Sequence, residues 1–168
     1  MRTMLFFICL SWSTLLFGQV DSLELKQINK DVWYNFMQAY QDLDASLFNQ
    51  IHTDDVMRVV LDQQQVWVGR EYLDRNLEVF NRWNANRLNQ QIEFSFLSRL
   101  QKEDWAYEVG IYKIRRFGKF GQETNHYGKF YVTLRKVNGT WKIQTDADSS
   151  ENGNITALDF VSGNQLSY

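Results

Sequence analysis

Two runs of alternating apolar and polar residues, late in the chain, flank Asn138-Gly139. An Asn-Gly pair is the strongest short signal for a tight hairpin, because both turn positions take positive φ. Counting outward from this turn places five apolar side chains on one face of the hairpin: Phe130, Val132, Leu134, Trp141 and Ile143. The same count predicts that Asp146 and Asp148 lie on the opposite, polar face, with Asp148 across from Lys129.

The residues before the hairpin are predicted to form helices first and long strands afterwards, with two short strands between the helices. Apolar residues at helical spacing predict three helices, over 25–43, 45–51 and 70–86. Asp44 is the expected cap of the second helix. Short β-branched runs and period-two alternation predict four strands, over 56–61, 66–68, 92–100 and 105–112. Gly110 and Gly128 fall inside predicted strands and indicate bulges or bends. Helices collected on one face of a bent antiparallel sheet define the α+β class.

The first residues have the pattern of a secretory signal peptide. Arg2 precedes an apolar run over 4–17, and Gly18 offers a small residue at a cleavage point. The run is short for a membrane span, although an uncleaved anchor is the alternative. We expect residues 1–18 to be removed, leaving a mature protein that begins at Gln19, is secreted or periplasmic, and has no membrane span.

Length and composition fit one folded domain. The chain has 168 residues, of which 44% are apolar and 15% aromatic, enough for a substantial core. The formal net charge is −2 and the sequence contains no basic stripe, which argues against a nucleic-acid-binding protein. Cleavage would remove Cys9, the only cysteine, so the mature chain would have no disulfide and no thiol nucleophile. The predicted parts are a signal peptide, one domain and a C-terminal tail, over 1–18, 19–150 and 151–168.

Five short segments occur in an order and spacing that resemble one superfamily. They read YQDLDA, DD, VGRE, WAYEVG and NGTWKI, at 40–45, 54–55, 68–71, 105–110 and 138–143. Together they resemble the nuclear transport factor 2-like superfamily, and within it the SnoaL-like group with ketosteroid isomerase-like relatives. The resemblance spans about Lys26 to Ser149. It implies a cone, in which a strongly curved, mostly antiparallel sheet wraps around the N-terminal helix and leaves a pocket between them.

Members of this superfamily bind or convert small, mostly apolar molecules, or act as dimerising modules, so the resemblance indicates a pocket and not a reaction. Ketosteroid isomerase chemistry itself is not expected. The resemblance places the oxyanion-stabilising tyrosine of that branch at Tyr34. Its carboxylate base would fall near Val60, which cannot take a proton, and its second acid near Val132 or Thr133.

The expected pocket lining is aromatic and apolar: Trp33, Tyr34, Met37, Tyr40, Phe80, Phe94, Tyr112, Phe130 and Val132. The candidates for catalysis are Tyr34, Glu108 and His126. If Glu108 faces the pocket, burial would raise its pKa and suit it to act as a base. An outward, solvated Glu108 is the favoured alternative, because glutamate is seldom buried. His126, at the start of the hairpin, has no evident partner, and we expect no metal site and no cofactor.

Two hypotheses from different classes follow. In the first, an exported protein binds a small apolar molecule in the cone pocket, with no reaction assigned. In the second, the chain is a non-catalytic module that forms homodimers through the convex face of the sheet. The outward row expected to supply that surface contains Tyr131, Thr133 and either Tyr107 or Tyr112. A homodimer is the expected assembly, since two-fold dimers are the commonest symmetric oligomers.

The tail carries the spacing of a calcium-binding loop over 148–159, with oxygen side chains at positions one, three, five, nine and twelve and glycine at position six. The alternative is a polar loop that leads into a short helix, with Thr156 as its cap, Asp159 three residues on and Gly163 at its end. We favour the helix, because the final calcium ligand would be the short Asp159 and no helix precedes the loop.

Overall fold

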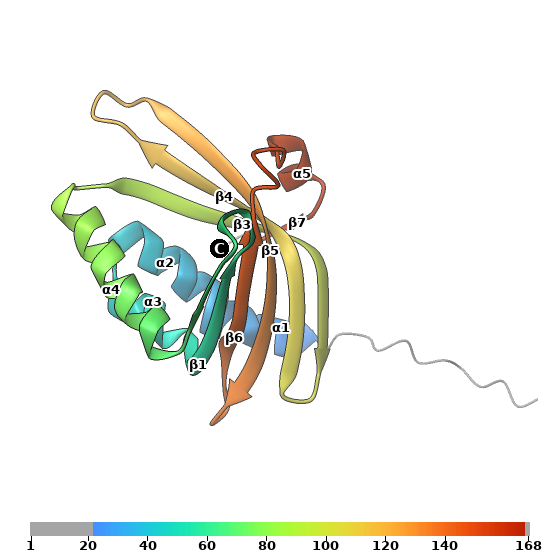
Figure 1. The fold of residues 1–168 in the computed structure, drawn as a ribbon. Coiled ribbons are helices and arrows are strands. Elements are labelled where there is room, and N and C mark those ends of the chain that lie inside the picture. The colour runs from blue at the N-terminus through green and yellow to red at the C-terminus, as the bar shows by residue number, and fades with distance from the viewer. Residues whose placement is uncertain (1–21, 167–168) are drawn as a thin grey trace, which may run out of the picture.

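A strongly curved sheet wraps around the N-terminal helices (Figure 1). The computed structural model describes residues 22–166. The strands are β1 (His52–Val60), β2 (Gln65–Val68), β3 (Asn89–Lys102), β4 (Trp105–Phe117), β5 (Glu123–Val137), β6 (Thr140–Ser149) and β7 (Asn164–Gln165). They form a seven-stranded sheet in the order β2-β1-β6-β5-β4-β3-β7. Within this sheet β1 and β6 run parallel, and the other neighbouring pairs run antiparallel.

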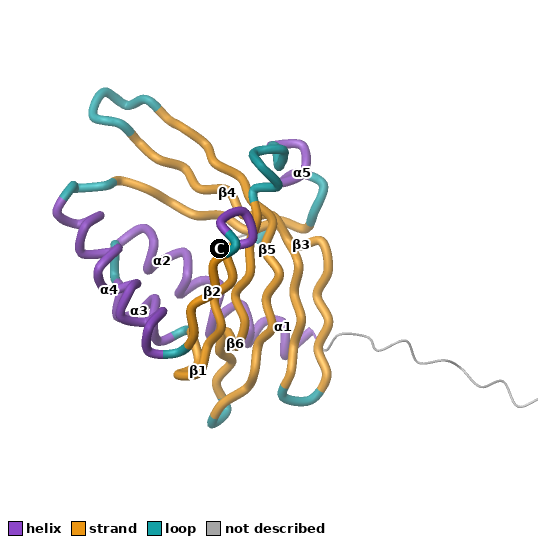
Figure 2. The backbone as a smooth tube through the Cα atoms, in the orientation of Figure 1, coloured by secondary structure: helices purple, strands orange, loops and turns teal. Residues whose placement is uncertain are grey.

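The helical segments are α1 (Ser22–Ile28), η1 (Asn29–Trp33), α2 (Tyr34–Asp42), α3 (Ala45–Gln50), η2 (Leu61–Gln63), α4 (Arg70–Ala85) and α5 (Ala157–Val161). Figure 2 shows α2, α3 and α4 gathered on one side of the sheet and α5 on the other side. This arrangement confirms the α+β cone predicted from the sequence.

No helix of the described residues is long and apolar enough to cross a membrane. The predicted signal peptide over 1–18 lies outside the described residues.

The first predicted helix is helical almost throughout, but its middle section, η1, is a π-helical turn. Leu43 then ends α2 with φ of 55°, and the Asp44 side chain caps α3 by accepting a hydrogen bond from the Leu47 amide at 2.9 Å. The predicted cap is therefore confirmed. Trp33, the last residue of η1, is buried against three rings, with centroid distances of 4.7 Å to Phe94 and 5.2 Å to both Phe96 and Phe130.

The curvature of the sheet has local causes in β3 and β4. Leu97 is an extra residue in β3, because Phe96 pairs with Gly110 and Ser98 pairs with Val109. A side chain at Gly110 would overlap the Phe130 ring, so glycine permits a close approach at this bend. The bulge increases the local twist and bends the strands around the helices.

The predicted register of the last hairpin is wrong beyond Leu134. Leu134 pairs with Ile143 as predicted, but Thr133 pairs with Thr145, so Gln144 is an extra residue in β6. The bulge moves every later residue of β6 to the other face. Asp148 consequently pairs with Phe130 rather than Lys129, and Asp146 and Asp148 share the concave face with the apolar residues of β5.

The C-terminal tail forms the short helix α5 and packs on the convex face. The amide of Thr156 donates to Asp159 Oδ2 at 2.8 Å in a capping box, which confirms the helical alternative. The Phe160 ring of α5 is buried near Tyr127 and below the Lys113 ammonium group. The two outermost carboxylates of the calcium-like spacing have other partners, since Asp159 caps α5 and Asp148 binds Arg58.

At the other end of the convex face, apolar side chains are exposed beside a shallow groove. Leu100 is 57%, Trp105 51% and Tyr107 41% exposed, and all three line the groove together with Thr133. Tyr112 lies on the concave face and lines the main cavity instead. The outward row of the dimer hypothesis thus contains Tyr107 and not Tyr112.

Candidate functional site

A cavity of about 490 Å³ lies between the helices and the concave face of the sheet. Seven of the nine residues predicted to line a pocket line this cavity: Trp33, Tyr40, Phe80, Phe94, Tyr112, Phe130 and Val132. Tyr34 and Met37 do not line it, and Met37 is buried in the core. Further aromatic walls come from Phe36, Phe48, Trp67, Tyr72 and Trp83.

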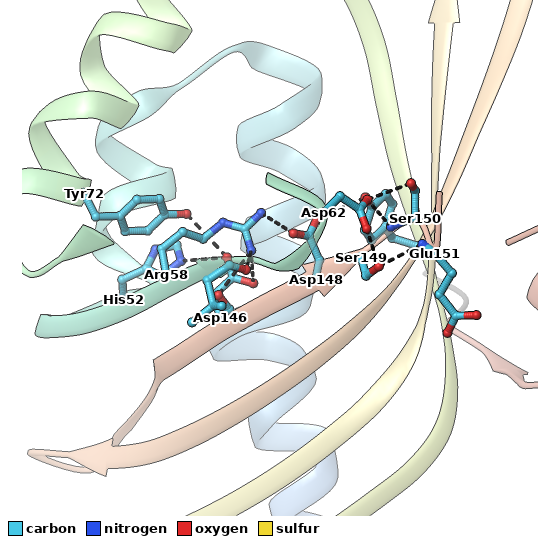
Figure 3. Close-up of polar contacts among 11 residues, drawn as sticks. His52, Arg58, Asp62, Tyr72, Asp146, Asp148, Ser149, Ser150 and Glu151 are labelled. Atoms are coloured by element: carbon cyan, nitrogen blue, oxygen red, sulfur yellow. Dashed lines mark hydrogen bonds and ion pairs between the residues drawn. The ribbon is translucent and has the colours of Figure 1, made fainter. Parts of the chain in front are cut away.

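One wall of the cavity carries an ion-pair cluster, which Figure 3 shows. Arg58 of β1 lies opposite Asp146 of the parallel strand β6. Its Nη2 is 2.7 Å from Asp148 Oδ1, and its Nη1 is 3.4 Å from Asp146 Oδ1. Burial opposes the charge of Arg58, but Asp146 and Asp148 outweigh that effect and raise the pKa of the guanidinium group. We call Arg58, Asp146 and Asp148 the charged wall.

Two tyrosine hydroxyls complete the hydrogen bonding of the charged wall. Tyr72 of α4 donates to Asp146 Oδ2 at 3.4 Å, and Tyr112 of β4 donates to Asp148 Oδ2 at 3.1 Å. Burial, together with the neighbouring carboxylates, raises the pKa of both tyrosines, so they remain neutral donors. Burial also raises the pKa of Asp148 against the opposing effect of Arg58. A carboxyl group with a raised pKa beside a cavity can accept or donate a proton.

Tyr40 of α2 lines the same cavity with a hydroxyl that makes no hydrogen bond to any residue in the range 22–166. Burial raises its pKa, while the charges of Arg58 and Arg116 work in the opposite direction. Tyr40 therefore offers a neutral hydroxyl close to the charged wall.

His52 lies behind the charged wall and does not line the main cavity. Its Nδ1 is 2.8 Å from the Phe48 carbonyl oxygen, which fixes the proton on Nδ1. Its Nε2 is buried without a hydrogen bond, 4.0 Å from Asp146 Oδ2. Burial lowers the pKa of His52 to about 4, so the ring is neutral at pH 7.

The favoured prediction that Glu108 faces solvent is wrong. Glu108 is fully buried, and it accepts hydrogen bonds from Trp33 Nε1 at 2.6 Å and Arg99 Nε at 2.7 Å. Arg99 is its direct partner across β3 and β4, so the buried charge is compensated. Burial still raises the pKa of Glu108, although Arg99 and Trp33 oppose the rise.

None of the three residues proposed for catalysis from the sequence lines the cavity. Glu108 lies behind Trp33, His126 is exposed near the start of β5, and Tyr34 is partly buried on α2. Among residues 22–166, no three His, Cys, Asp or Glu side chains lie together as a metal site would require.

The lining residues of η2, β2 and α4 and of the end of β4 include exposed and partly exposed side chains, and we call this part of the cavity the mouth. Its charged residues are Asp62, Arg75 and Arg116. Asp62 is occupied by a turn after β6, where it accepts hydrogen bonds from the Ser150 amide and hydroxyl at 2.7 Å and from the Ser149 hydroxyl (Figure 3).

Four residues of the site were not predicted from the sequence: Arg58, Tyr72, Asp146 and Asp148. A signal for Arg58 is present, because it interrupts an otherwise apolar strand, and an arginine there needs an acidic partner. Asp146 and Asp148, two residues apart in the same strand, share one face and could have supplied that partner. The bulge at Gln144, which turns both toward the cavity, has no signal in the sequence.

Solved structures with the same architecture include three bacterial proteins. An NTF-2-like protein of unknown function from Shewanella oneidensis MR-1 has a TM-score of 0.61 at 15% identity, over 75% of this chain and 98% of that one. The present chain has the nuclear transport factor 2-like fold. A ketosteroid isomerase-like protein from Erwinia carotovora atroseptica gives 0.58 at 20% identity, over 76% and 96%. The protein Aln2 from a Streptomyces species gives 0.68 at 13% identity, over 80% and 96%.

No protein-family model and no curated protein sequence matches the chain. Identities of 13–20% establish the nuclear transport factor 2-like fold alone, and this fold hosts many activities. What the protein does must therefore be inferred from the cavity.

Proposed function

We propose that this protein is exported and binds a small, largely aromatic or apolar molecule inside its cone, with a polar group of the ligand directed at the charged wall. The observation that carries the proposal is a cavity of about 490 Å³ with aromatic walls and one hydrogen-bonded charged wall. Ligand pockets have this composition and volumes of about 300 to 1,000 Å³. The proposal of export rests on the signal-like pattern of residues 1–18.

The presence of the charged wall supports a role in binding, because folding stability alone does not require charged residues there. A buried ion pair is often no more stabilising than apolar residues of similar volume. The charged wall has three tyrosine hydroxyls beside it, two of which donate to its carboxylates. A ligand hydroxyl or N–H would donate to Asp148, and the Tyr40 hydroxyl would donate to a ligand acceptor. These contacts would fix the orientation of a molecule that the aromatic walls hold without directional preference.

Proton transfer is the chemistry that this arrangement favours. Asp148 would take a proton from the ligand, or return one, because burial raises its pKa toward the working pH. Tyr112 would hold the Asp148 carboxylate in place through its hydrogen bond, and Arg58 would keep that carboxylate charged between transfers.

The test is calorimetric titration with 2-naphthol, a neutral aromatic molecule with one hydroxyl. We expect saturable binding of one molecule per chain. Asp148→Asn should weaken it, since the amide is a weaker acceptor than the carboxylate. Ile114→Trp, at the cavity wall, should abolish binding by filling the space. Thr133→Trp, on the convex face of the same sheet, is the matched control and should bind like the wild type.

Absence of binding by the wild type would contradict the proposal. Equal loss of binding in Ile114→Trp and Thr133→Trp would also contradict it, because that result would locate the ligand outside the cavity. A cooperative thermal unfolding transition, measured for each variant, is the control that the variant is folded.

A further inference from the structure

We infer that the ligand carries an anionic group, such as a carboxylate, which binds Arg116 and Arg75 at the mouth while its apolar part occupies the cavity. The inference rests on the proposed function and specifies the class of molecule. It follows from which charged side chains of the cavity already have partners.

Six charged residues line the cavity: Arg58, Asp62, Arg75, Arg116, Asp146 and Asp148. Four of them are already engaged, because the charged wall is internally paired and Asp62 binds the turn after β6. Arg75 and Arg116 form no ion pair with any carboxylate of residues 22–166. The charged groups left for a ligand are therefore two guanidinium groups, and both are positive.

Arg116 is placed by the alternation of β4. Tyr112, Ile114 and Arg116 are two residues apart, and all three line the cavity. Arg116 is the last of this row and lies where the cavity opens, beyond the apolar Ile114. Its Nε donates to Gln90 Oε1 at 3.4 Å, which orients the guanidinium group and leaves its two terminal nitrogens without a hydrogen-bond partner among the described residues.

The surroundings of Arg116 add a second sign of an incomplete polar site. Gln90 is 1% exposed and pairs with Arg116 across β3 and β4, on the same face of the sheet. Its Nε2 is buried without a hydrogen-bond partner. A buried amide donor normally has a partner, so a small rearrangement that brings this amide to a ligand oxygen would lower the free energy of the bound state.

Arg75 approaches the mouth from α4. Its guanidinium carbon lies 4.4 Å from the centre of the Trp67 ring of β2, and both residues line the cavity. Stacking on an aromatic ring holds the guanidinium plane while its edge remains able to bind an anion. A carboxylate between Arg75 and Arg116 would gain hydrogen bonds that water competes for poorly at a partly enclosed site.

The charges also predict the orientation of the ligand. The charged wall carries one positive and two negative groups, so its formal charge is −1, whereas Arg75, Arg116 and Asp62 give the mouth a formal charge of +1. An anion is therefore attracted to the mouth and repelled from the wall. The uncharged end of the ligand, with any hydroxyl or N–H group that meets the charged wall, enters first, and the carboxylate stays near the surface.

The experiment compares 2-naphthoate with 2-naphthamide, which have the same ring system and differ in charge. We expect 2-naphthoate to bind the wild type at least about tenfold more tightly at low salt. This preference should decrease as the salt concentration rises, because the mouth is open to solvent. Arg116→Gln and Arg75→Gln should each reduce the preference severalfold, because each should weaken 2-naphthoate binding more than 2-naphthamide binding.

The matched control is Arg115→Gln, which removes one positive charge from the adjacent position of the same strand. Arg115 does not line the cavity and is paired with Glu93 and Glu123. Its substitution should leave the preference for 2-naphthoate intact. Because Arg75 is exposed and outside the core, its variant should fold even if Arg116→Gln does not.

Four results would overturn the inference. Equal affinity for the two probes, or an equal loss of preference in Arg115→Gln, would show that the mouth does not select an anion, and would leave the proposed function standing. A preference that survives in both Arg75→Gln and Arg116→Gln would locate the selection elsewhere. Binding of neither probe by the wild type would contradict the proposed function and the inference together.

Discussion

Removing Arg58 should destabilise the protein in a manner that depends strongly on pH. The variant Arg58→Met keeps most of the side-chain volume but leaves Asp146 and Asp148 without their cation. The three side chains are only 16%, 12% and 18% exposed. Breaking a fully buried pair costs about 3 to 5 kcal/mol, and this residual exposure places the expected loss near the lower end, at about 3 kcal/mol at pH 7.

The sign of the pH dependence follows from Asp148. Burial raises its pKa in the folded state, and Arg58 is the main group that opposes the rise. In Arg58→Met the folded pKa rises further, so the folded protein holds a proton that the unfolded chain releases. The contribution of Asp148 to the stability of the variant is therefore greatest below the unfolded pKa, about 4, and is lost as the pH rises through the folded pKa. The deficit relative to the wild type should shrink as the pH falls from about 7 to about 4.

The assay is urea unfolding followed by tryptophan fluorescence at several pH values. Arg135→Met is the matched control, because Arg135 pairs with Asp55 at 3.2 Å and both side chains are well exposed, at 35% and 63%. That variant should lose no more than about 1 kcal/mol at any pH. A deficit in Arg58→Met that is independent of pH, or no larger than that of Arg135→Met, would refute the assignment of Arg58 as the buried counter-charge.

The remaining predictions concern other parts of the chain. Burial lowers the folded pKa of His52 to about 4, so wild-type stability should fall below about pH 6.5, by up to about 1.4 kcal/mol per pH unit, and His52→Gln should flatten this slope in urea unfolding. Asp159→Ala should cost about 1 kcal/mol by removing the capping box, and millimolar calcium should not shift the thermal unfolding of the wild type; a calcium-dependent increase would restore the calcium-loop hypothesis. Light scattering should find a homodimer, and Trp105→Glu on the exposed convex patch should dissociate it; a monomeric wild type would contradict this proposal. N-terminal sequencing of exported protein should begin at Gln19, and exported material that begins at Met1 would exclude cleavage.

Features set by neighbouring residues could be predicted from the sequence. The Asn138-Gly139 turn, the Asp44 cap and the Thr156 capping box each depend on a few adjacent residues, and the structure has all three. The aromatic residues of the cavity follow from periodicity and from the superfamily resemblance, because such side chains must face the interior of the cone.

The charged wall could not be predicted because it depends on contacts between distant residues. Arg58 meets Asp146 only because β1 and β6 pair in parallel, 88 residues apart in the chain. The bulge at Gln144 then decides which face the carboxylates occupy. Glu108 was misassigned for a related reason, since its burial is made possible by Arg99 from the neighbouring strand. Charged side chains are usually exposed, but in each of these cases a partner on a neighbouring strand compensates the charge and allows the side chain to be buried.

The most direct test of ligand binding in the cavity is a proton–nitrogen NMR titration of the tryptophan indole groups with 2-naphthol. Trp67 and Trp83 line the mouth and Trp33 the interior, whereas Trp105 is exposed on the convex face. Binding in the cavity predicts saturable shifts of the Trp33, Trp67 and Trp83 indole signals with one common affinity, and an unchanged Trp105 signal. Shifts confined to Trp105, or no shift at saturating probe, would contradict the account.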